Sequence, residues 1–137
     1  MTALRVRDLM TNTVYSLMPR DDLFAAQSLM DEHNVRHVPV VDEEQDLVGL
    51  ITMRDLLRAA NPGDAELPLE MVEAHKHAVH VAELMTEEVA TVSPDDDLQD
   101  TARLMLDNKF GCVPVVQGSR LAGILTEADF VRYFVSD

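Results

Sequence analysis

The segment VRDLMTNTV at residues 6–14 returns as VAELMTEEV at residues 81–89, and LVGLITMRD at residues 47–55 returns as LAGILTEAD at residues 121–129. With one gap, the whole stretch from Val6 to Arg58 aligns with the stretch from Val81 to Arg132. A repeat of about 75 residues is too long for a solenoid unit and too short for an ordinary independent domain. The duplication therefore predicts two pseudo-symmetric half-domains that share a core, with equivalent residues reaching a cleft from both sides.

Length and composition fit one compact domain. The chain has 137 residues, of which 47% are hydrophobic and only 4% aromatic, which predicts an aliphatic core. Its net charge of -14 repels a phosphate backbone, so we expect no nucleic-acid partner. One cysteine, no signal peptide and no apolar run of about 18 residues predict a cytoplasmic protein without membrane insertion. The short ends and the full double repeat lead us to expect a complete chain.

Each repeat is expected to run strand, helix, strand, strand, helix. The β-branched stretches 13–17 and 89–92 predict the first strands. PRDD and PDDD then predict helix starts, with Asp21 and Asp96 as N-caps. Apolar stripes on the two helices are expected at Leu23, Ala26 and Met30, and at Leu98, Ala102 and Met105.

The rest of each repeat predicts a small mixed sheet covered by helices. HVPVV and CVPVV, and LVGLIT and LAGILT, are apolar runs of strand length, and a helix follows from Thr52 or Thr126. The fold class is therefore α/β (α+β). We divide the chain into residues 1–60, a linker at 61–80 with a short helix within 66–78, and residues 81–137.

Thr52 and Asp55, and their equivalents Thr126 and Asp129, stand where a buried strand is expected to turn into a helix. Such a pair can be a capping box, in which the hydroxyl and the carboxylate bond each other's backbone amides. The same position suits a phosphate, and a carboxylate there can accept both hydroxyls of a ribose diol. The sequence leaves both interpretations open.

The chain resembles a tandem pair of CBS domains (the cystathionine β-synthase motif), also called a Bateman module. The resemblance is carried by the duplication itself, by HVPVVD and CVPVVQ, by GLITMRD and GILTEAD, and by DLMT and ELMT. It implies two β-α-β-β-α repeats packed sheet to sheet, and two clefts that bind adenine nucleotides or adenosyl compounds. It also implies a homodimer shaped as a flat disc of four CBS domains.

By this resemblance, Asp55 and Asp129 hold ribose hydroxyls, and Thr52 and Thr126 face phosphate. The backbone at Val38, Pro39, Val113 and Pro114 meets adenine, and Ser16, Thr91 and Cys112 line the clefts. The first repeat adds Arg36, His37 and Arg54, where the second has Gly111, Cys112 and Ala128. Because arginine grips phosphate with paired hydrogen bonds, we expect phosphate to prefer the cleft that these basic residues serve, although the sequence does not assign Arg36 to one cleft. The alternative is that both arginines pair with surface acids.

Other chemistry is expected to be absent. The linker histidines His75, His77 and His80 invite a metal hypothesis, but no closed ligand set accompanies them, so we predict no metal. Cys112 has no basic neighbour in sequence and is interpreted as a small buried hydrophobe. With no nucleophile and base pair and no glycine-rich phosphate loop, we expect no enzyme and no catalytic cofactor.

The sequence thus predicts a regulatory sensor that binds AMP, ADP, ATP or S-adenosylmethionine and signals to another protein by a conformational change. A first alternative is a purely structural interaction or dimerisation module, in which the Thr–Asp pairs serve only as caps. A second is a divalent-cation sensor, suggested by acidic runs such as DEEQD at residues 42–46.

Overall fold

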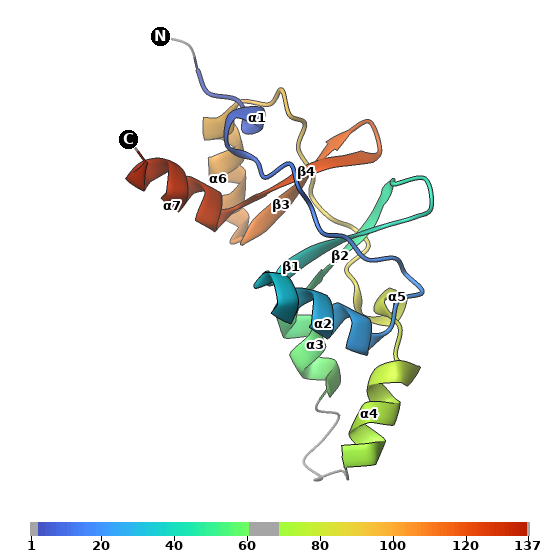
Figure 1. Cartoon of the computed structure of the whole chain (residues 1–137). Helices are drawn as coiled ribbons and strands as arrows, with labels where there is room; N and C mark the ends of the chain where they lie inside the picture. Colours follow the sequence, from blue (N-terminus) through green and yellow to red (C-terminus); the bar gives the residue numbers. More distant parts are fainter. Residues whose placement is uncertain (1–2, 61–68, 137) are drawn as a thin grey trace. The chain divides into compact units, whose positions relative to one another are not determined.

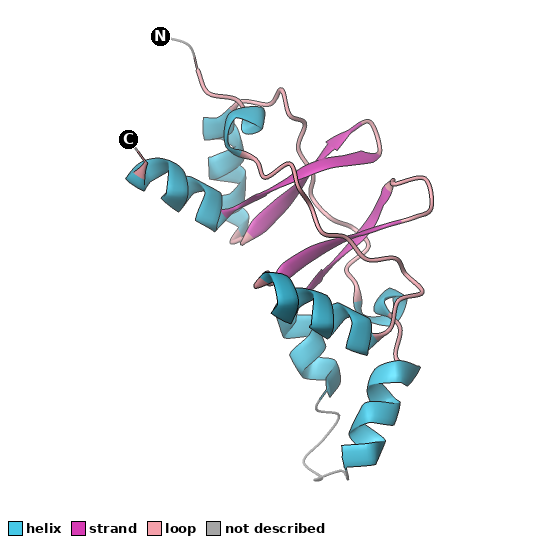
Figure 2. Cartoon of the chain, in the orientation of Figure 1, coloured by secondary structure: helices cyan, strands magenta, loops and turns pink. Residues whose placement is uncertain are grey.

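The computed structural model describes residues 3–60 and 69–136 (Figure 1). Its mixture of helices and two small sheets confirms the predicted fold class (Figure 2). In chain order, the elements are α1 (Val6–Leu9), α2 (Leu23–His33), β1 (His37–Val41), β2 (Leu47–Thr52), α3 (Met53–Ala60), α4 (Leu69–Ala78), α5 (Val81–Leu84), α6 (Leu98–Asn108), β3 (Cys112–Gln117), β4 (Arg120–Thr126) and α7 (Glu127–Val135).

The described chain forms two compact units, and their boundaries do not coincide with those of the repeats. Unit 1 contains Met1–Val14, Gln45–Leu47 and Val89–Asp137, and unit 2 contains Tyr15–Glu44 and Val48–Glu88. The segments that open the repeats, residues 5–11 and 80–86, are here called the opening segments. Each opening segment lies in the unit built mainly from the other repeat.

Backbone hydrogen bonds fix the opening segments in these places. In unit 1, Val6 N donates to Asp96 O at 3.0 Å. In unit 2, Val81 N donates to Asp21 O at 2.7 Å. Val6 and Val81 are both 0% exposed, so each completes the hydrophobic core of its unit.

Each unit contains a two-stranded sheet. β3 and β4 pair antiparallel, with Cys112 opposite Thr126 and Gln117 opposite Arg120. The first strand expected in each repeat is reduced to one parallel bridge, from Leu17 to Val40 in unit 2 and from Val92 to Val115 in unit 1. In unit 2, helices α2, α3 and α4 pack on one another, and α2 and α3 lie next to the β1–β2 sheet (Figure 2).

The expected apolar stripe of α2 is confirmed, and that of α6 is corrected at one position. Leu98 and Met105 are buried, but the buried residue between them is Thr101 rather than Ala102. Thr101 aligns with Ala26 of the first repeat, so burial follows the repeat although the residue is polar. Its hydroxyl donates to Asp97 O at 3.0 Å, which satisfies the polar group.

The predicted N-caps were wrong by one residue. Asp22 caps α2 by accepting from Ala25 N at 2.8 Å, and Asp97 caps α6 by accepting from Asp100 N at 3.0 Å. Asp21 and Asp96 instead stabilise the preceding turns, accepting from Met18 N and Ser93 N. A carboxylate bonds the amide two or three residues after the cap, so clustered aspartates leave the choice to the geometry of the turn.

The glycines of the closing strands are required by close approach of the opening segments. A Cβ on Gly123 would lie 2.8 Å from Thr11 O, and one on Gly49 would lie 2.7 Å from Met85 Sδ and 3.0 Å from Thr86 O. Real Cβ atoms essentially never lie under 3.0 Å from another heavy atom, and a contact of 3.0 Å is tighter than most. The repeated glycine and the repeated Leu-Met-Thr segment are therefore one packing feature, present in both units.

Helices long and apolar enough to cross a bilayer are absent from residues 3–60 and 69–136.

Candidate ligand-binding site

In unit 2, the candidate site forms where β2 ends and α3 begins. Asp55 Oδ2 accepts hydrogen bonds from Thr52 N at 2.9 Å and from Thr52 Oγ1 at 3.0 Å, and Thr52 Oγ1 accepts from Asp55 N at 3.3 Å. The capping interpretation of this pair is therefore confirmed. No described residue of the chain donates a hydrogen bond to the second carboxylate oxygen, Asp55 Oδ1, and the side chain is half-buried.

Arg36 lies beside this corner. Its carbonyl accepts from Met53 N at 2.8 Å, so the residue before β1 is fixed next to the first turn of α3. Arg36 and Arg54 are both exposed. Within residues 3–60 and 69–136, neither guanidinium forms an ion pair, although the chain carries a net charge of -14. Among the residues that the structure describes, the alternative in which both arginines pair with surface acids is not observed.

In unit 1, the equivalent carboxylate is fully engaged. Asp129 Oδ2 accepts from Thr126 N at 2.8 Å and from Thr126 Oγ1 at 3.3 Å. Its Oδ1 accepts from Thr11 Oγ1 at 2.9 Å and from Arg132 Nη2 at 2.5 Å. Asp129 is 5% exposed and belongs to the few buried polar residues among those described.

The remaining predicted site residues divide cleanly between the units. Ser16, His37, Val38 and Pro39 lie in unit 2 with Thr52, Arg54 and Asp55, whereas Thr91, Cys112, Val113 and Pro114 lie in unit 1 with Thr126 and Asp129. Val38 and Val113 are buried at equivalent positions of β1 and β3, as are the prolines that follow them. Ser16 is half-buried and Thr91 is exposed.

Cys112 is the first residue of β3 and is 5% exposed. Burial raises the pKa of its thiol from 9.0 to about 12, because the charged thiolate is not solvated there. The thiol therefore stays protonated at physiological pH and is no nucleophile, in agreement with its interpretation as a buried hydrophobe.

The linker histidines contact three different groups. His75 Nε2 lies 2.8 Å from Ala59 O, and His77 Nδ1 lies 3.0 Å from Asp22 Oδ2. The backbone of His80 donates to Glu83. The side chains of Glu70 and Glu73 on the same helix, α4, lie outside the described part. The pKa of the Asp22 carboxyl is lowered, chiefly by the hydrogen bond from the Ala25 amide and next by the hydrogen bond with His77, because both favour the charged carboxylate.

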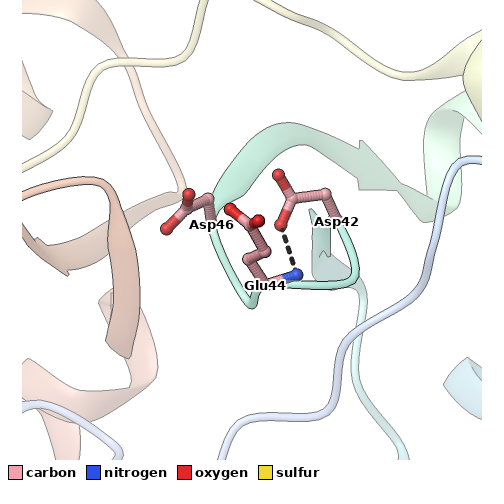
Figure 3. A group of neighbouring side chains, drawn as sticks. All are labelled: Asp42, Glu44 and Asp46. Atoms are coloured by element: carbon pink, nitrogen blue, oxygen red, sulfur yellow. Dashed lines mark hydrogen bonds between the residues drawn. The ribbon is translucent and has the colours of Figure 1, made fainter.

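The acidic run at residues 42–46 brings three carboxylates together in the turn between β1 and β2. Asp42, Glu44 and Asp46 each offer a ligand atom, and these atoms all lie within 4.8 Å of one another (Figure 3). Asp42 Oδ1 also accepts from Glu44 N at 2.9 Å. Exposed acidic groups of this kind are common without an ion, so the cluster does not by itself select a cation.

Two segments of the chain match the family model of the CBS domain, residues 6–61 and residues 81–136. The chain belongs to the CBS-domain family. The resemblance predicted from the duplicated motifs is thereby confirmed, and both repeats are CBS domains.

Several known proteins resemble the chain over nearly its whole length. MJ1225, an uncharacterized protein of Methanocaldococcus jannaschii, is 33% identical over 132 residues, which are 96% of this chain and 43% of that protein. The crystal structure of CBSX2 in complex with AMP matches with a TM-score of 0.80 and 32% identity, covering 96% of both chains. The CBS domain pair of MJ0100, in complex with 5′-methylthioadenosine and S-adenosyl-L-methionine, matches with a TM-score of 0.79 and 28% identity, covering 97% of both chains.

Two residues that the sequence analysis missed decide how the CBS carboxylates differ. Thr11 and Arg132 engage Asp129, but their equivalents Thr86 and Arg58 donate no hydrogen bond to Asp55 within the described residues. Both columns are identical in the two CBS domains. The identity of these residues between the two repeats could have drawn attention to them. It does not tell a side chain that bonds the carboxylate from one that faces solvent.

Proposed function

We propose that the chain is a non-catalytic, cytoplasmic regulatory module that binds an adenine nucleotide at Asp55 and signals to a partner protein by a change in conformation. The observation that carries the proposal is the free carboxylate oxygen of Asp55 beside two exposed arginines that form no ion pair within the described chain. In this proposal, the carboxylate binds the ribose of the nucleotide and the arginines bind its phosphate.

The Asp55 carboxylate has enough hydrogen-bonding capacity left to accept a ribose diol. An ionised carboxylate has two oxygens and about four lone-pair sites. Thr52 uses the two sites on Asp55 Oδ2, so Oδ1 retains both of its sites. A ribose diol offers two hydroxyl donors, which is the number that Oδ1 can accept. The capping box and the ribose contact are therefore compatible on one carboxylate.

The positive charges of Arg36 and Arg54 would attract the phosphate of a nucleotide. Arg54 lies in the first turn of α3, and the backbone of Arg36 is fixed beside that turn. Neither side chain forms an ion pair within the described residues of a chain of net charge -14. A charge-assisted hydrogen bond to phosphate contributes about 1.5–3 kcal/mol. Such a site favours an anionic nucleotide over S-adenosylmethionine, whose sulfonium group is positively charged.

The solved CBS pairs support an adenosyl ligand. AMP in CBSX2, and 5′-methylthioadenosine and S-adenosyl-L-methionine in MJ0100, all contain adenine joined to a ribose diol. They differ at the 5′ position, which is the part that the arginines would contact in this chain. We therefore rank AMP, ADP or ATP above the neutral and cationic adenosyl compounds.

Titration calorimetry and thermal shift with AMP test the proposal. We expect saturable binding, and at a hundred times the Kd the ligand should stabilise the fold by about 2.7 kcal/mol. Asp55→Asn should weaken AMP binding by about tenfold or more, because the asparagine carbonyl can replace Oδ2 toward Thr52 and leave an NH₂ donor facing the ribose.

Asp31→Asn is the matched control, since Asp31 is an exposed carboxylate on α2 without a hydrogen bond in the described chain. It should leave AMP binding unchanged. Absence of any thermal shift with millimolar AMP, ADP and ATP would contradict the nucleotide proposal.

A structural interaction module is the second candidate, because Asp55 and Asp129 both cap helices. Such a module would bind no nucleotide, so the wild type and Asp55→Asn would both show no AMP binding. The same titration therefore separates the two functions.

We also propose a homodimer formed through the last helix of each CBS domain. Both helices expose an apolar residue at the equivalent position, Leu57 at 63% on α3 and Val131 at 61% on α7, and Phe134 on α7 is 89% exposed. Exposed side chains of this size at equivalent positions favour a symmetric interface. Sedimentation equilibrium should give twice the chain mass, and Leu57→Glu with Val131→Glu should give the monomer mass. A monomeric wild type would contradict the proposal.

A further inference from the structure

We infer that the two equivalent carboxylates of this chain have different roles. Asp129 is a structural latch that fixes the first opening segment, residues 5–11, to helix α7, and Asp55 is the one carboxylate that binds a ribose. The second half of this inference rests on the proposed function. The first half stands on the geometry of unit 1 alone.

Asp129 has no capacity left for a ribose diol. Two donors reach each of its oxygens, Thr126 N and Thr126 Oγ1 on Oδ2, and Thr11 Oγ1 and Arg132 Nη2 on Oδ1. These four donors fill the roughly four lone-pair sites of a carboxylate. A ligand could bind here only by displacing Thr11 and Arg132 together.

The position of Asp129 agrees with this count. Its side chain in the ion pair with Arg132 is 3% exposed, while the arginine side chain itself is 66% exposed. A buried carboxylate that lost a cationic partner would remain desolvated and uncompensated. Arg132 and Thr11 therefore satisfy the buried charge of Asp129. Removing either side chain should destabilise the contact between the opening segment and α7.

Thr11 connects this carboxylate to the opening segment. The backbone of Thr11 pairs with Ile124 through bonds of 2.9 and 3.1 Å, and its hydroxyl adds the bond to Asp129. In unit 2, Thr86 makes the equivalent backbone pair with Leu50 at 2.9 and 3.0 Å. Its hydroxyl has no hydrogen bond to Asp55 within the described residues. The backbone docking is the same in both units, and the side-chain latch is specific to unit 1.

Amide hydrogen exchange tests the latch without any ligand. Thr11→Val keeps the shape of the side chain and removes the donor, so exchange in residues 5–11 should become about tenfold faster. Asp129→Asn should have the same effect or a larger one. Thr86→Val is the matched control and should leave exchange in residues 80–86 unchanged. Equal changes for Thr11→Val and Thr86→Val, or no change for Thr11→Val, would overturn the latch.

Equilibrium dialysis with AMP tests the ligand half. We expect one AMP per wild-type chain, a Kd raised at least tenfold by Asp55→Asn, and a Kd within about threefold of wild type for Thr11→Val. Two AMP per chain, reduced to one by Asp129→Asn, would overturn the division of roles. If wild type binds no AMP, the proposed function fails, while the exchange experiment still decides whether Asp129 is a latch.

Discussion

Gly123→Ala is expected to lower the free energy of unfolding by about 3 kcal/mol, the upper end of the range for overpacking a well-packed interior. The added Cβ would lie 2.8 Å from Thr11 O and 3.1 Å from Met10 Sδ. Thr11 O is a backbone atom held in a pair with Ile124, so it cannot rotate away as a side chain could. The substitution must separate the opening segment from β4 or distort the strand.

Gly49→Ala is the matched variant in unit 2 and should cost less. Its closest contact would be Met85 Sδ at 2.7 Å, which belongs to a flexible side chain, and the backbone atom Thr86 O lies at 3.0 Å. Urea unfolding monitored by circular dichroism gives both free energies. A loss for Gly123→Ala below about 1 kcal/mol would show that the opening segment is not fixed against β4 as the structure places it.

Replacing Arg36 and Arg54 by glutamate is expected to weaken AMP binding by about a hundredfold or more. Under the proposed function, the change removes two cations that would approach phosphate, and each charge-assisted bond is worth about 1.5–3 kcal/mol. Adenosine lacks the phosphate, so its weaker affinity should change by no more than about threefold. Calorimetric titration of both ligands measures the difference directly.

Arg103→Glu provides the control for total charge. Arg103 is exposed on α6 in unit 1 and has no ion pair within the described residues. It should reduce AMP affinity only slightly, and the reduction should vanish at high salt because interactions between solvent-exposed charges are screened. An equal loss of AMP and adenosine binding in the double arginine variant would mean that the two arginines do not contact phosphate.

The sequence predicted much of the fold because the repeat carries consistent signals at several levels. Apolar runs of strand length and an apolar stripe on α2 matched the elements of the structure. The docking of each opening segment in the unit of the other repeat could not be predicted. Because the two repeats have the same pattern, the segment could equally well pack on its own repeat. Only the tertiary contacts of Val6 and Val81 distinguish the two arrangements.

The candidate site was predictable as a set of residues but not as two different environments. The Thr–Asp pairs follow from their place between strand and helix, and both form the expected caps. The engagement of Asp129 by Thr11 depends on a side chain 118 positions away. Since Thr11 and Thr86 are identical in the repeat, residue type alone contains no information about which hydroxyl finds a partner.

The exchange of opening segments also bears on how such a chain arose. In this chain, the core of each unit contains a valine, Val6 or Val81, that comes from the opening segment of the other repeat. Two copies of a single-repeat polypeptide could form the same cores, with each copy docking its opening segment on the other. Gene fusion would then have joined two copies that already docked their opening segments on each other, so this mutual docking would have preceded the tandem chain.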